Sequence, residues 1–160
     1  LLMSTDTKRR LFLKGSVAAS ALGVAVGAGL LTPQAVLAAW PEAAFTAKEV
    51  GAAAKELLGT DATTESADIN VKAPDIAENG AVVPITVETS IEGVESIAIM
   101  ASENPVPLVA NFVMGEGALG FSGTRIKMGK TGDVVALVKA GDTVYTARKN
   151  VKVTIGGCGG

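Results

Sequence analysis

Apolar residues recur at every second position through most of the chain after Asp68, and turn residues interrupt these runs at short intervals. A period of two places apolar side chains on one face of an extended strand, whereas a helix needs a period of 3.6. The expected strands are residues 69–71, 83–87, 94–99, 106–113, 119–128, 134–139 and 143–155. The chain is therefore predicted to be mainly β.

The connections between these strands are short. Asn79-Gly80 and Glu92-Gly93 are turn pairs, and Gly141-Asp142 between two runs has the form of a tight hairpin. The glycine-rich stretch 115–123 lacks the lysine and the helix of a phosphate-binding loop, so we expect turns or bulges there. Seven short strands at this spacing predict an immunoglobulin-like antiparallel β-sandwich.

Residues 45–59 carry the signals of a helix that packs outside the sandwich. Thr46 and Glu49 fit a capping box, and Gly59 suits the end of a helix. The apolar residues of this stretch share one helical face; they are Val50, Ala53, Ala54, Leu57 and Leu58. We expect this face to belong to the core or to a subunit contact, and the polar residues 60–67 to form a loop.

Residues 1–38 have the layout of an export signal, with a basic front, an apolar run and small residues at the end. Arg9 and Arg10 open the stretch RRLFLK, which matches the twin-arginine consensus at every specified position. The apolar run 17–31 is too short and too rich in glycine to span a membrane. We expect cleavage after Ala38 and a periplasmic product without a membrane anchor; a Sec signal with a chance arginine pair is the alternative.

Composition excludes several kinds of chemistry. The 160-residue chain has no histidine and one cysteine, so neither a Cys/His zinc site nor a histidine-based nucleophile relay can be built. Metal binding by carboxylates alone is possible but has no spacing signal in the sequence, and we expect no metal and no cofactor. After residue 38 there are 10 Lys and Arg against 15 Asp and Glu, a net charge of −5, which disfavours nucleic acid as a partner.

The lone cysteine lies in the last five residues, GGCGG. Glycine has the widest backbone freedom, so residues 156–160 are predicted to form a flexible, slender arm beyond a carrier domain of residues 39–155. Five extended residues reach on the order of 17 Å, enough to enter a deep pocket of another protein. No cationic residue adjoins Cys158, so its thiol lacks the activation of catalytic cysteines and suits a handle for a carried group.

The terminal GGCGG, the strand VKVTI before it and the twin-arginine leader together resemble the SoxY family, the sulfur-carrier subunits of the bacterial Sox thiosulfate-oxidation system. The resemblance extends through leader, mature length, helix and strand order. It implies a carrier that is not itself an enzyme, with Cys158 as the covalent attachment site. The glycines of the swinging arm would be Gly156, Gly157, Gly159 and Gly160.

The resemblance also implies partners. The first is a SoxZ-like subunit, which forms a heterodimer with the carrier. Three enzymes act on the arm in this family: a c-type haem enzyme that joins thiosulfate to the cysteine, a manganese hydrolase that releases sulfate, and a molybdenum–haem dehydrogenase that oxidises the remaining sulfur. The metals and haems belong to these partners.

Two alternatives remain from the residues alone. An unpaired cysteine in an exported protein can form an intermolecular disulfide, which would make the chain a structural sandwich domain crosslinked through Cys158. A ubiquitin-like carrier would instead receive sulfur on the carboxylate of Gly160. That reaction needs ATP, which an exported protein cannot readily obtain.

Overall fold

The computed structural model describes residues 41–154. The predicted leader, residues 1–38, and the predicted arm, residues 156–160, lie outside the described residues, so both boundaries stay predictions. The elements in chain order are α2 Glu42–Thr46, α3 Val50–Leu58, β1 Thr64–Glu65, β2 Ile69–Lys72, β3 Ile76–Ala77, β4 Val83–Thr89, β5 Val94–Ala101, β6 Leu108–Val113, β7 Phe121–Ile126, β8 Gly132–Ala140 and β9 Thr143–Val153.

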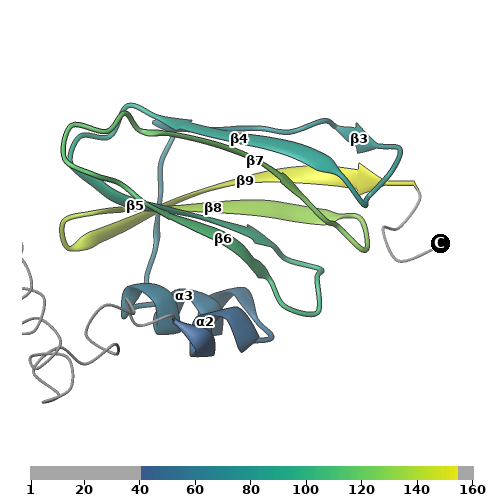
Figure 1. The fold of residues 1–160 in the computed structure, drawn as a ribbon, viewed down its shortest axis with the longest axis horizontal. Helices are drawn as coiled ribbons and strands as arrows, with labels where there is room; N and C mark the ends of the chain where they lie inside the picture. The colour runs from purple at the N-terminus through teal and green to yellow at the C-terminus, as the bar shows by residue number, and fades with distance from the viewer. Residues whose placement is uncertain (1–40, 155–160) are drawn as a thin grey trace, which may run out of the picture. The chain divides into compact units, whose positions relative to one another are not determined.

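The strands form two sheets, so the chain is mainly β as expected (Figure 1). The larger sheet has the order β1-β9-β8-β5-β6, with β3 also paired to β9, and the smaller has the order β2-β4-β7. All seven predicted strands are present, with ends that differ by a few residues. The more specific assignment to the immunoglobulin-like class stays a prediction.

The fold differs from expectation at the outer edge of β9. Two short strands, β1 and β3, pair with β9 in parallel, in a fold predicted to be antiparallel throughout. β1 lies within residues 60–67, so the prediction that this whole stretch is a loop is wrong. Strands of two residues have no periodicity to reveal them, because their pairing depends on β9, a distant part of the chain.

The main core lies between the two sheets. Ile97 and Ile99 of β5 face Val138 and Ala136 of β8, and all four side chains are buried. Ile85 of β4 meets them from the smaller sheet and is 1% exposed. The alternation seen in the sequence therefore marks the faces that the two sheets bury against each other.

The helices form a third layer on the outer face of the larger sheet (Figure 1). Ala53 and Ala54 of α3 are buried against residues of that sheet such as Met100 and Leu137, and the larger residues of the same helical face are partly buried beside them. Small alanine side chains let the helix approach the sheet closely. The predicted apolar face is therefore core, which leaves it unavailable for a subunit contact.

The start of the predicted helix is wrong, whereas its end is confirmed. Two helices replace one, because the chain is extended at Ala47, and Glu49 precedes α3 without a capping hydrogen bond from its side chain. The Thr46 hydroxyl instead donates back to the carbonyl of Glu42, within α2. Gly59 ends α3 in the left-handed conformation, with φ of 80°, and its N–H donates to the carbonyl of Lys55.

The hairpin between β8 and β9 is also confirmed. Ala140 pairs with Thr143, so Gly141 and Asp142 form a two-residue loop. Gly141 has φ of 58°, the positive value that the first position of such a turn requires. Within residues 115–123, a turn joins Gly115 to Ala118, followed by the start of β7, as expected for a connection between strands.

Candidate functional site

The predicted functional residues all lie at the two ends of the chain. Cys158 and its four neighbours Gly156, Gly157, Gly159 and Gly160 lie outside the described residues, as do Arg9 and Arg10 of the leader. The structure does describe the base from which residues 155–160 continue, which is the end of β9. The candidate site is therefore this base, residues 151–154, together with the segments that hold it.

One edge of the base is held by β8 and by the residue before it. The backbone pairing between β8 and β9 ends with Gly132 opposite Val151. Beyond that point the Thr131 hydroxyl accepts a hydrogen bond from the Val153 N–H at 2.9 Å and donates to the Val153 carbonyl at 3.3 Å. One hydroxyl group thus forms hydrogen bonds with both the N–H and the carbonyl of Val153.

The other edge of the base is held by β3 and its neighbours. The Lys152 N–H donates to the Asp75 carbonyl at 3.0 Å, and the Thr154 N–H donates to the Ala77 carbonyl at 3.1 Å. The Thr154 hydroxyl also donates to the Glu78 carbonyl at 3.2 Å. β9 ends beside β3 in Figure 1, where the yellow strand reaches the right-hand end of the sandwich.

An ion pair reinforces this edge. The Lys149 ammonium group contacts the carboxylate of Asp75, the residue directly before β3. The hydrogen bond and the positive charge from Lys149 hold the pKa of Asp75 below its usual range. Because the Asp75 side chain is 84% exposed, water screens the pair and its contribution to stability is small.

The backbone N–H groups of residues 152, 153 and 154 therefore all have partners, alternately on the two edges of β9. The chain is held in place up to Thr154, four residues before Cys158. The sequence pattern does not indicate which residues hold the end of β9. Thr131 and Asp75 lie in connections between strands, where nothing in their spacing relates them to β9.

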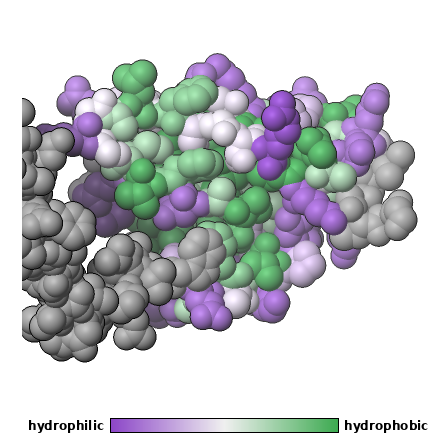
Figure 2. Space-filling view, viewed as in Figure 1, coloured by the Kyte–Doolittle hydropathy of each residue, from purple (hydrophilic) through white to green (hydrophobic). Residues whose placement is uncertain are grey.

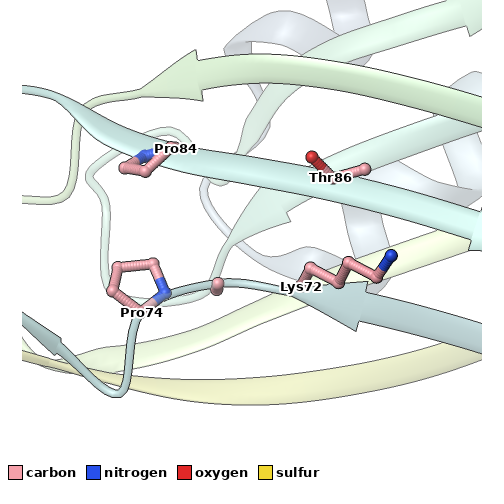
Figure 3. A pocket seen from close by; sticks show the side chains of 5 residues that line it. Lys72, Pro74, Pro84 and Thr86 are labelled. Atoms are coloured by element: carbon pink, nitrogen blue, oxygen red, sulfur yellow. The ribbon is translucent and has the colours of Figure 1, made fainter.

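Other parts of the described surface offer no comparable site. A depression of about 330 Å³ lies between β2 and β4, where Pro74 and Pro84 line one end and Lys72 and Thr86 the other (Figure 3). The Lys72 ammonium group is already paired with the Glu88 carboxylate at 2.7 Å. Among residues 41–154 there is no cluster of acidic or cysteine side chains suited to a metal ion.

Apolar side chains are exposed at the connection between β6 and β7. Val113 is 80% exposed, Leu119 is 84% exposed and Phe121 is 55% exposed. Figure 2 shows apolar residues interspersed with hydrophilic ones over the face in view. In the described part of the chain, neither helix is long and apolar enough to cross a membrane.

Comparison with known proteins gives a family match and similar solved structures. Residues 54–158 match the family described as sulfur oxidation protein SoxY. A similar solved structure is the sulfur carrier protein SoxY from Chlorobium limicola f thiosulfatophilum, with 41% identity, a TM-score of 0.62, and coverage of 72% of this chain and 100% of that one.

A second solved structure is more distant. The superoxide reductase (neelaredoxin) from Ignicoccus hospitalis has 16% identity and a TM-score of 0.48, with coverage of 57% of this chain and 80% of that one. The comparison with curated proteins gives no significant match.

Proposed function

Because this chain belongs to the SoxY family of sulfur oxidation proteins, we propose that it is a sulfur carrier that holds thiosulfate-derived intermediates on Cys158. The family match is the observation that carries the proposal, since it extends through the body of the domain and ends at residue 158. The anchored end of β9 supports it further. A carrier needs a stable base from which its attachment residue can extend into a partner.

The chemistry that we propose is carried out by partner enzymes on the sulfur of Cys158. A c-type haem enzyme joins thiosulfate to the thiol: the thiol loses its proton, a sulfur–sulfur bond forms, and two electrons pass to the haem enzyme. A manganese hydrolase then uses water to split off sulfate and leaves a persulfide. A molybdenum–haem dehydrogenase oxidises the outer persulfide sulfur to a sulfonate, with oxygen atoms from water and the electrons passing to the dehydrogenase. A second hydrolysis then releases this group as sulfate and frees the thiol. The chain supplies the attachment point and its reach, so it is a carrier and not an enzyme.

We propose that this cycle takes place in the periplasm, after export by the twin-arginine pathway that Arg9 and Arg10 specify. We also propose a SoxZ-like subunit as a stable partner. The exposed apolar residues Val113, Leu119 and Phe121 support such a contact, because side chains of this kind are frequent in subunit interfaces. The buried face of α3 does not support it, since that face packs against the larger sheet.

Mass spectrometry tests the attachment directly. The mature protein is incubated with thiosulfate and the haem enzyme, and its intact mass and terminal peptide are measured. We expect the terminal peptide to gain one thiosulfate-derived group, and the Cys158→Ser variant to gain none. An unmodified wild-type protein, or a Cys158→Ser variant that is modified equally, would contradict the proposal.

The same samples separate the two alternatives. Non-reducing electrophoresis that shows only a Cys158-linked dimer, with no adduct, would favour a crosslinked structural domain. Fragment masses that place the added sulfur on the carboxylate of Gly160 would favour a ubiquitin-like carrier. Export is tested independently by replacing Arg9 and Arg10 with lysine, which we expect to leave the uncleaved precursor in the cytoplasm.

A further inference from the structure

The last strand remains hydrogen-bonded beyond the point where its pairing with β8 ends. Gly132 opposite Val151 is the last pair of that ladder, yet both backbone groups of Val153 have a partner in the Thr131 hydroxyl. A strand whose edge loses its neighbour usually frays over its last residues. Here the hydroxyl takes the place of the next backbone partner on this edge. On the other edge, β3 pairs with β9 as far as Ala77 opposite Val153.

We propose that Thr131 is a positioning residue for the sulfur carrier, because it fixes the point from which the arm extends. This inference rests on the proposed function. With Thr131 in place, β9 is held on both edges, and Cys158 follows the held residue Thr154 by four positions. Without it, one edge of Val153 is released, and residues 152–154 are held from the β3 side alone.

A threonine suits this role because one hydroxyl both accepts and donates a hydrogen bond. Its oxygen accepts from the Val153 N–H at 2.9 Å and donates to the Val153 carbonyl at 3.3 Å. Valine has nearly the same shape and lacks both capacities. Serine keeps both capacities and lacks only a methyl group, so it is the conservative variant.

The hydrogen bonds on the β3 edge of β9 limit how far loss of the Thr131 hydroxyl can loosen the strand. The N–H groups of Lys152 and Thr154 donate to carbonyls on the β3 side, and these bonds do not involve Thr131. Loss of the hydroxyl therefore loosens the base and does not detach it. When the loosened base opens as far as Val153, the stretch that ends at Cys158 lengthens from four residues to six. The effective concentration of the sulfur in a partner pocket therefore falls by at most about twofold.

The first measurement is amide hydrogen exchange in the full mature chain. We expect Thr131→Val to speed exchange at Val153 by about fivefold, which is the effect of losing one hydrogen bond, and Thr131→Ser to restore slow exchange. The matched control is Thr143→Val. Thr143 begins the same strand, and its hydroxyl has no hydrogen-bond partner among the described residues.

The second measurement is the reaction of Cys158 in the same variants. We expect kcat/KM for adduct formation by the haem enzyme to fall in Thr131→Val, by at most about twofold, and to be near the wild-type value in Thr131→Ser and Thr143→Val. Alkylation by iodoacetamide should proceed at one rate in all four proteins, because a small reagent needs no positioned arm. If Thr131 only stabilised the fold, Thr131→Val would lower the melting temperature and leave the ratio of the haem-enzyme rate to the iodoacetamide rate unchanged.

The outcomes distinguish this inference from the function on which it rests. If the wild-type protein receives no adduct, the carrier function itself fails. If the wild type is modified and Thr131→Val is modified at the same kcat/KM, Thr131 does not position the arm. Unchanged exchange at Val153 in Thr131→Val would also overturn the inference, because the hydroxyl would then not be holding the strand.

Discussion

Deletion of Gly156 and Gly157 tests how far the sulfur of Cys158 must reach from the anchored end of β9. Thr154 is the last residue held by both its N–H and its hydroxyl, so reach is measured from there. Four extended residues span at most about 14 Å, and two span about 7 Å. The deletion therefore removes half of the available reach without altering any described residue.

The expected result is a loss of enzymatic modification at unchanged chemical reactivity. A displacement of 1 Å between reacting groups can lower a rate by about a hundredfold. A sulfur that stops about 7 Å short should therefore show at least that loss in kcat/KM with the haem enzyme. The rate of alkylation by iodoacetamide reports the thiol itself and should match that of the wild type.

A variant of unchanged chain length separates the effect of the reach of Cys158 from the effect of side-chain bulk. Replacing Gly156 and Gly157 by alanine keeps all four residues and adds only two methyl groups. We expect this variant to be modified faster than the deletion, with any remaining deficit caused by side-chain bulk in the partner pocket. A deletion variant that is modified at the wild-type rate would show that the enzymes need no extended arm, and would refute the reasoning.

Two further predictions concern the body of the domain. Because its pKa is lowered by Lys149, the Asp75 carboxylate contributes stability at neutral pH, and this contribution is lost as the pH falls through that lowered pKa. Asp75→Asn should therefore lower the melting temperature slightly at neutral pH and have no such effect in acid below that lowered pKa; an equal decrease under both conditions would contradict the ion pair. Gly120→Ala should destabilise the fold by about 1–3 kcal/mol in urea denaturation, because its Cβ would lie 2.7 Å from the Thr89 carbonyl oxygen. Gly115→Ala, whose Cβ would have nothing within 4 Å, is the control, and equal losses in the two variants would refute the steric argument.

The features that could be predicted were those that the chain carries locally. Alternation with a period of two located every long strand, because an extended backbone sends successive side chains to opposite faces. The apolar face of the helix was found in the same way. Helix ends were harder to predict. Gly59 stops α3 because few other residues adopt its positive φ. A threonine hydroxyl can cap a following helix or bond back within its own helix, and that of Thr46 donates to the Glu42 carbonyl within α2.

The sequence by itself determined that the one cysteine would follow a predicted strand of a mainly β domain, since residue identity and order require no folding. Only the tertiary structure decided what holds that strand. Asp75 contacts Lys149 across 74 positions of the sequence, and Thr131 binds Val153 across 22. Such pairs carry no local period, because they exist only once β3, β8 and β9 lie side by side.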